Sequence, residues 1–157
     1  MSAPKLVNLP AFDVAGTSVR TSNVAEQNPA TTQIGDNWQR FFADGHHERI
    51  PKASDKLLGV YTDYENNNMG AFSLITGFEV SSVEDLSDGI VGVQIPEQDY
   101  LVFHAEGKMP TIVIETWGRV MAHFVTNEEY ERAYTADFEL YPNENEVDIH
   151  IAVRAKN

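Results

Sequence analysis

The sequence predicts an α+β fold in which duplicated βαββ units form an antiparallel sheet with two main helices and a central cleft. Two observations predict it. The apolar pattern changes from strand-like to helix-like and back twice along the 157 residues, and similar residues recur at matching points of both halves. One unit alone can bury only one sheet face under one helix. We therefore expect a single domain over residues 1–157, with halves at about residues 4–82 and 89–156.

The first half begins with a strand over residues 6–20, rich in β-branched residues and bent at Pro10. Asn28 and Pro29 predict the start of a helix that ends near Gly45, with asparagine as the N-cap and proline at the first helical position. The apolar face of this helix consists of Ile34, Trp38, Phe41 and Phe42. Two strands then follow, at residues 56–64 and 71–80, and the turn-forming residues 66–70 connect them.

The second half repeats this order. Residues 90–103 predict a strand interrupted by Pro96, and Pro110 predicts the start of the second helix. The apolar face of that helix consists of Val113, Trp117, Val120, Met121 and Phe124. Residues 136–141 and 147–155 predict the last two strands, whereas residues 128–132 predict a solvated helical turn.

Composition excludes several classes of function. Twenty-four acidic against eleven basic residues give a net charge of −13, which disfavours nucleic-acid binding and leaves a basic protein partner open. There is no cysteine, and the five histidines lack metal-ligand spacing, so we expect no disulfide, no metal and no other cofactor. Motifs for phosphoryl transfer and serine hydrolysis are absent from the sequence.

Targeting signals are absent as well. The amino terminus lacks a signal-peptide pattern, and no apolar stretch reaches the roughly 20 residues that span a bilayer. We expect a cytoplasmic protein without membrane contact. The sequence leaves its oligomeric state open.

Short segments in a constant order carry a family likeness. They are Leu9-Pro10-Ala11, Val14-Ala15-Gly16, Trp38, Leu58-Gly59-Val60-Tyr61, Gly77-Phe78-Glu79-Val80, Ile95-Pro96, Tyr100, Trp117, Asp137-Phe138-Glu139-Leu140-Tyr141 and Val147-Asp148-Ile149-His150-Ile151. With them the chain resembles the GyrI-like domains, which are the effector-binding modules of AraC-type and MerR-type drug-responsive activators and also occur in DNA gyrase inhibitory proteins. The resemblance implies a ligand cleft at a pseudo-twofold axis, where a strand glutamate and aromatic rings meet cationic, amphipathic compounds.

Glu139 matches that glutamate and is the central candidate for ligand binding. Alternation places Asp137, Glu139 and Tyr141 on one face of their strand. Taken alone, alternation favours a solvated carboxylate on the outer face of a sheet. In an aromatic cleft, burial would raise the pKa of Glu139, and a bound cation would lower it again.

Five aromatic residues are further ligand-binding candidates. Trp38 and Trp117 hold equivalent places on the two helices, so we expect them to flank the cleft. Tyr61 follows Trp38 by 23 residues and Glu139 follows Trp117 by 22, which puts Tyr61 across the axis from the carboxylate. Tyr141 and Tyr100 are the remaining candidates. Ordinary core packing is the alternative for all five.

Three functions fit these observations. The first is a stand-alone effector-binding domain that binds hydrophobic cations without catalysis. Regulators of the family carry a helix-turn-helix domain ahead of the effector domain, whereas here about four residues precede the first strand. The second is hydrolysis of a small molecule with Glu139 as general base. The third is inhibition of DNA gyrase by the acidic surface.

Overall fold

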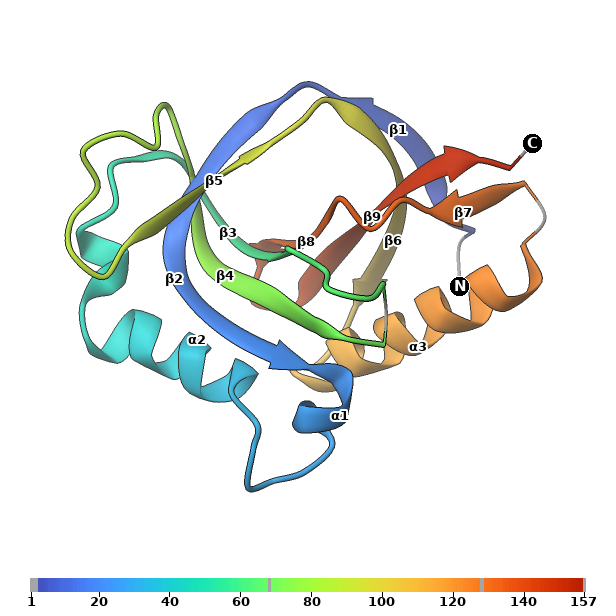
Figure 1. The fold of residues 1–157 in the computed structure, drawn as a ribbon, viewed down its shortest axis with the longest axis horizontal. Coiled ribbons are helices and arrows are strands. Elements are labelled where there is room, and N and C mark those ends of the chain that lie inside the picture. The colour runs from blue at the N-terminus through green and yellow to red at the C-terminus, as the bar shows by residue number, and fades with distance from the viewer. Residues whose placement is uncertain (1–2, 68, 128, 157) are drawn as a thin grey trace.

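The computed structural model describes residues 3–67, 69–127 and 129–156, which form an α+β fold (Figure 1). The strands are β1 (Lys5–Leu9), β2 (Phe12–Ser22), β3 (Lys52–Thr62), β4 (Ala71–Val80), β5 (Val91–Ile95), β6 (Gln98–Glu106), β7 (Tyr130–Arg132), β8 (Ala136–Asn143) and β9 (Glu146–Ala155). The helices are α1 (Asn23–Glu26), α2 (Ile34–Ala43), α3 (Thr111–Thr126) and a 3₁₀ turn, η1 (His46–Glu48).

The strands form one antiparallel sheet with the order β1-β6-β9-β8-β3-β4-β2-β5, and β7 pairs with β9. β3 and β8 pair at the centre, and matching strands of the two halves follow outward on either side. β1 and β5 each cross to the opposite half, pairing with β6 and β2. The sheet curls into a half-barrel, with α2 and α3 on its outer face (Figure 1). The duplicated βαββ fold expected from the sequence is confirmed.

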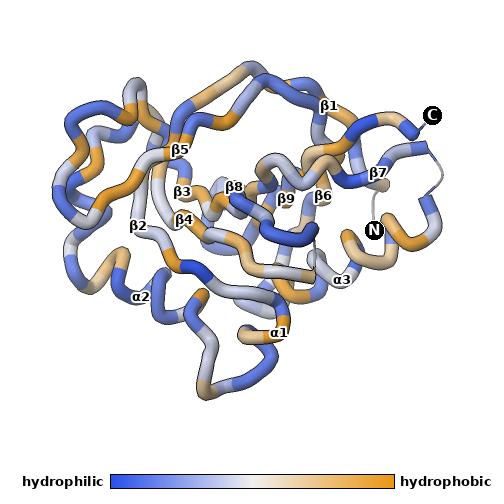
Figure 2. Tube along the Cα trace, viewed as in Figure 1, coloured by the Kyte–Doolittle hydropathy of each residue, from blue (hydrophilic) through white to orange (hydrophobic). Residues whose placement is uncertain are grey.

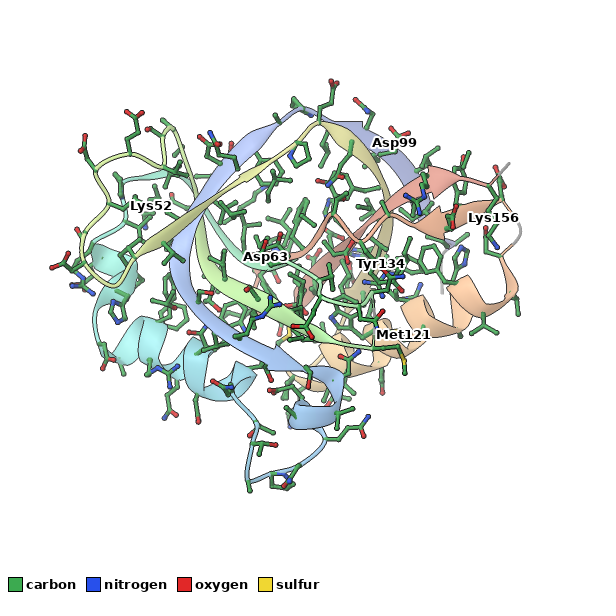
Figure 3. All side chains as sticks on the ribbon, in the orientation of Figure 1. Lys52, Asp63, Asp99, Met121, Tyr134 and Lys156 are labelled. Carbon is green, nitrogen blue, oxygen red and sulfur yellow. The ribbon has the colours of Figure 1, made fainter. Side chains whose placement is uncertain are left out.

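Apolar side chains pack on both faces of this curled sheet. Inside the curl, Val60, Tyr100 and Phe138 belong to one core cluster, and side chains fill this space (Figure 3). On the outer face, α3 covers a cluster that includes Ile149, and Phe41 of α2 belongs to another. Apolar residues therefore occur on both helices and along the strands (Figure 2). Because both faces are covered, alternate side chains of the central strands point either into the curl or under the helices. Neither set points into water.

The helix expected between Asn28 and Gly45 is α2, and it begins later than expected. α2 starts at Ile34, and residues 27–31 form turns, so Asn28 and Pro29 are not its N-cap and first residue. The carboxylate of Glu26 instead accepts hydrogen bonds from the main-chain N–H groups of Gln33 and Ile34, at 2.9 and 3.3 Å. A side chain from α1 thus satisfies free donors at the start of α2, which a local capping pattern does not reveal.

The prediction of a helical turn at residues 128–132 is wrong, because Tyr130–Arg132 forms strand β7. Asn68 of the expected turn and Glu128 lie outside the described residues. The other boundaries are close: β3 runs over Lys52–Thr62 instead of 56–64, and α3 starts directly after Pro110. In the described part of the chain, no helix has both the length and the apolar character needed to cross a membrane.

Candidate functional site

A cavity of about 690 Å³ lies between α2 and α3, on the outer face of the two central strands. We call it the Glu139 cavity. Its lining comes from α2, β3, the start of α3, β8 and the turn after β8: Ile34, Gly35, Trp38, Asp55, Leu57, Tyr61, Met109, Pro110, Val113, Ile114, Glu139, Tyr141, Pro142, Asn143 and Glu144. The expected central cleft is therefore present. Its apolar walls and central carboxylate are typical of a small-molecule site.

Glu139 forms part of the floor of this cavity. It is only 2% exposed, and on β8 it pairs with Gly59 of β3. Its Oε2 accepts the indole N–H of Trp117 at 2.6 Å and the hydroxyl of Tyr61 at 3.0 Å. Its Oε1 accepts the hydroxyl of Tyr141 at 2.7 Å. The solvated position that alternation alone favoured is thus wrong, because helices cover the outer face of this sheet.

Two opposing effects act on the pKa of Glu139. Burial raises the pKa of its carboxyl, and the hydrogen bonds from Trp117, Tyr141 and Tyr61 lower it, with a net shift upward. Burial and the neighbouring carboxylate also raise the pKa of Tyr61 and of Tyr141, so both phenols stay protonated donors. Among the lining residues named above there is no lysine, arginine or histidine. Among the described residues, the carboxylate therefore has hydrogen bonds but no ion-pair partner.

Aromatic rings surround the carboxylate in two edge-to-face pairs. Trp38 meets Tyr141 with ring centroids 5.5 Å apart and an interplanar angle of 85°, and Tyr61 meets Trp117 at 5.2 Å and 70°. Trp38 lines the Glu139 cavity directly, whereas Trp117 lies beyond Tyr61 and borders a smaller cavity of about 190 Å³. The two tryptophans therefore flank Glu139 from opposite helices, but they are not equivalent walls of one cavity.

Gly59 is a site residue that sequence reasoning missed as such. A Cβ at this position would lie 3.0 Å from Oε1 of Glu139 and 3.0 Å from Cζ2 of Trp38. Only glycine leaves both the carboxylate and the indole in place without displacement. The Leu-Gly-Val-Tyr segment, which places a glycine inside a strand two residues before Tyr61, is the signal that could have identified it.

Tyr100 lies away from this cavity. It is fully buried inside the curl, packs edge-to-face against Phe138 at 5.2 Å and accepts a hydrogen bond from Gln98 at 2.8 Å. For this residue the structure shows the core-packing alternative, because its side chain points to the inner face of the sheet. Trp38, Tyr61, Trp117 and Tyr141 gather around Glu139, and Tyr100 does not.

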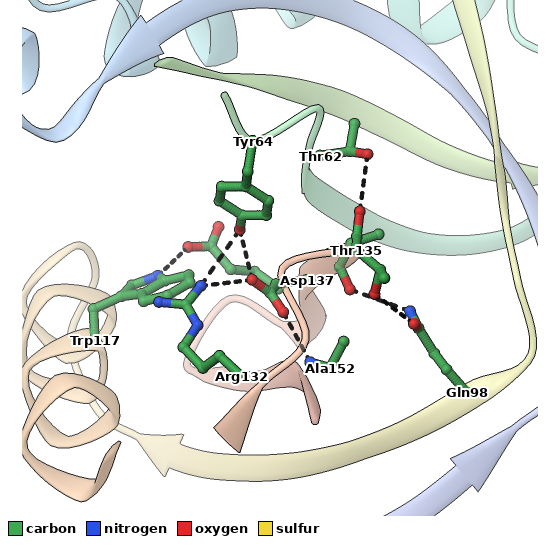
Figure 4. A network of polar contacts seen from close by, with 10 residues as sticks. Thr62, Tyr64, Gln98, Trp117, Arg132, Thr135, Asp137 and Ala152 are labelled. Carbon is green, nitrogen blue, oxygen red and sulfur yellow. Dashed lines mark hydrogen bonds and ion pairs between the residues drawn. The ribbon is translucent and has the colours of Figure 1, made fainter. Parts of the chain in front are cut away.

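A buried ion pair lies behind Trp117 (Figure 4). Arg132 donates to Oδ2 of Asp137 at 2.6 Å, Tyr64 donates to the same oxygen at 2.5 Å, and the main-chain N–H of Ala152 donates to Oδ1 at 2.8 Å. The Arg132 guanidinium also lies 6.0 Å from the ring of Trp117. Sequence reasoning missed this network, because it assigned Arg132 to a solvated turn.

One surface cluster has the composition of a metal site. Single ligand atoms of His104, Glu106 and Glu146 lie within 4.8 Å of one another. His104 also contacts Asp148 at 2.5 Å, and the hydrogen bonds to Asp148 and Glu106 raise its pKa. In the cluster the imidazole pairs with the carboxylates of Glu106, Glu146 and Asp148 at the surface.

Comparisons with known proteins bear on the site. A family model described as Cass2, integron-associated effector binding protein, matches residues 5–153. An integron cassette protein from the mobile metagenome of Vibrio cholerae is 38% identical, with a TM-score of 0.84 over 97% of this chain and 96% of that one. The structure of SAV2435 bound to tetraphenylphosphonium shares the fold, with a TM-score of 0.79 at 19% identity over 98% of this chain and 94% of that one.

A further relative is a transcription factor. The transcriptional regulator BrlR of Pseudomonas aeruginosa is 29% identical over 158 residues, which are 95% of this chain and 54% of BrlR. The chain thus spans about half the length of that regulator.

Proposed function

Because the chain belongs to the Cass2 family of integron-associated effector binding proteins and has the GyrI-like fold, we propose that it binds cationic, amphipathic small molecules in the Glu139 cavity. Glu139 supplies the counter-charge, and the rings of Trp38, Tyr61 and Tyr141 contact the apolar part of the ligand. Trp117 holds the carboxylate in position from behind.

The observation that carries the proposal is a buried carboxylate that has no ion-pair partner in the described part of the chain. Ionised and unpaired, such a group is costly to bury. A cation in the cavity offsets this cost, and each aromatic face that it touches adds about 0.5–2 kcal/mol. Oε1 of Glu139 accepts one hydrogen bond where Oε2 accepts two, and Glu139 belongs to the lining of the cavity. This oxygen is the proposed contact for the ligand.

The acidic lining supports the same ligand class. Besides Glu139, the lining contains the carboxylates of Asp55 and Glu144, both exposed residues at the cavity. Asp55 forms an exposed ion pair with Lys52 at 3.4 Å. Glu139 and Glu144 leave the lining with a net negative charge, which attracts cations and repels anions. The binding of tetraphenylphosphonium by SAV2435 is a further argument, since that protein shares the fold.

A shape-matched pair of ions tests the proposal. Tetraphenylphosphonium and tetraphenylborate carry the same four phenyl rings with opposite charges. The fluorescence of the two tryptophans reports on binding, because Trp38 lines the cavity and Trp117 donates to Glu139. We expect saturable quenching by the phosphonium and affinity at least tenfold weaker for the borate. Similar affinities for the two ions would contradict the role of charge.

The hydrolase alternative fits the contacts less well. A general base works with a second catalytic group that protonates the leaving group or positions the water. No histidine lines the cavity, and both phenols near Glu139 have raised pKa values, which makes them poor acids. Gyrase inhibition rests on net charge alone. Turnover of an ester or epoxide library that is lost in Glu139→Gln would favour hydrolysis.

A further inference from the structure

A second cavity of about 410 Å³ lies on the opposite face of the same central strands. Because side chains alternate along β8, Phe138 and Leu140 line this cavity, whereas Glu139 and Tyr141 line the first. Leu58 of β3 and the bend between β1 and β2, residues 9–12, form further walls. The two cavities are thus separated by the sheet itself. We call the second one the His150 cavity.

His150 provides the polar group of this cavity. The side chain comes from β9, lines the cavity and is only 8% exposed. Its Nδ1 lies 3.1 Å from the main-chain oxygen of Asp148, which can only accept, so Nδ1 carries the proton. Burial lowers the pKa of His150, which keeps the ring neutral. Nε2 is then a bare acceptor, and the structure gives it no partner among the described residues.

The surroundings of His150 favour a flat ligand. Its ring stacks on Phe138 with centroids 4.2 Å apart and an interplanar angle of 14°. Phe12, on the bend between β1 and β2, meets Phe138 edge-to-face at 5.4 Å. Aromatic guests pack well against such rings in offset or edge-on geometry.

The charges at the two cavities differ. Lys56 and Glu79 bring one charge of each sign to the His150 cavity, whereas the Glu139 cavity has acidic groups only. A cation therefore gains little in the second cavity. A neutral molecule with a hydrogen-bond donor matches an acceptor nitrogen in apolar surroundings, because burying that nitrogen unpaired is unfavourable.

We propose that the His150 cavity is a second binding site, which takes small neutral aromatic molecules that carry an N–H or O–H donor. The donor binds Nε2 of His150, and the ring of the ligand packs against Phe12 and Phe138. This site is independent of the Glu139 cavity, so each site can be occupied alone.

Indole and indene test the proposal, because they have nearly the same shape and only indole has an N–H group. Titration of the wild-type protein with indole, followed by nitrogen-15 NMR of the histidine rings, is expected to shift the Nε2 signal of His150. We expect indole to bind about 2- to 12-fold more tightly than indene, the range for one neutral hydrogen bond. An unmoved His150 signal at saturating indole, or equal affinities, would overturn the proposal.

Two variants distinguish indole binding in the His150 cavity from binding in the Glu139 cavity. Glu139→Gln is expected to bind indole with unchanged affinity, and His150→Phe, which keeps a stacked ring, is expected to lose the preference for indole over indene. Loss of indole binding in Glu139→Gln would place the ligand in the first cavity and overturn the proposal. The wild-type NMR titration decides the outcome even if His150→Phe does not fold. Tetraphenylphosphonium binding unchanged by saturating indole is the result expected for independent sites.

Discussion

Replacing Glu139 with glutamine removes the buried charge and keeps the shape of the side chain. The hydrogen bonds can also be kept. The amide oxygen takes the place of Oε2 and accepts from Trp117 and Tyr61, and the amide NH₂ takes the place of Oε1 and donates to Tyr141. The hydroxyl of Tyr141 needs only to rotate. Glu139→Gln therefore tests the charge with little disturbance of the packing.

The affinity for a cation is expected to fall in this variant. An interaction with a charged partner is worth about 1.5–3 kcal/mol, which corresponds to roughly 10- to 150-fold in the dissociation constant of tetraphenylphosphonium. Fluorescence titration and calorimetry measure this change. Tetraphenylborate binding is expected to stay equal or improve.

The stability of the ligand-free protein is expected to change in the opposite direction. The pKa of Glu139 is raised in the folded state, so near neutral pH its ionisation disfavours folding. The folded wild type binds more protons than the unfolded chain between the unfolded pKa of about 4.3 and the folded pKa. The contribution of Glu139 to stability therefore declines as pH rises through that window. Urea unfolding at several pH values should show that Glu139→Gln lacks this decline and is the more stable protein at pH 7.

Glu84→Gln is the matched control, because Glu84 is exposed in a loop outside both cavities. It removes the same charge from the molecule. Unchanged phosphonium affinity in Glu139→Gln, or an equal loss in Glu84→Gln, would refute the local role of the carboxylate.

Three further predictions concern residues around the site. Gly59→Ala places a Cβ against Glu139 and Trp38, so phosphonium affinity should fall about fivefold, the equivalent of one aromatic contact of about 1 kcal/mol. Gly118→Ala, which has open space, should leave affinity unchanged in the same titration. Arg132→Met leaves the Asp137 charge buried and unpaired and should lower the free energy of unfolding in urea by about 3–5 kcal/mol. Glu26→Ala removes the cap of α2 and should cost about 1 kcal/mol in the same assay, whereas an unchanged value would mean that water replaces the cap.

Much of the site could be predicted because its signals are local. Spacing from Trp38 and Trp117 placed Tyr61 across from Glu139, and the structure confirms this with a hydrogen bond of 3.0 Å. Tyr141 shares the face of Glu139 because side chains alternate along a strand. These residues belong to regular elements, whose periodicity is visible in a single sequence.

The remaining features depend on contacts between different elements of the chain. Arg132 is buried because β7 pairs with β9, and its carboxylate partner Asp137 lies on another strand. The start of α2 depends on Glu26, whose contact with Ile34 spans a turn. Neither contact lies within one helix or strand, so neither follows the period of a regular element.

The sequence by itself determined the duplicated frame, the positions of the central strands and the set of residues that share a face with Glu139. Periodicity and turn residues are sufficient for that, because they act over a few positions. Only the tertiary structure decided what each face meets. The curl of the sheet buries its inner face and two helices cover its outer face, so Glu139 lies under the helices and Tyr100 and His150 lie inside the curl. Alternation sorts side chains into two sets, but it does not say what covers either set.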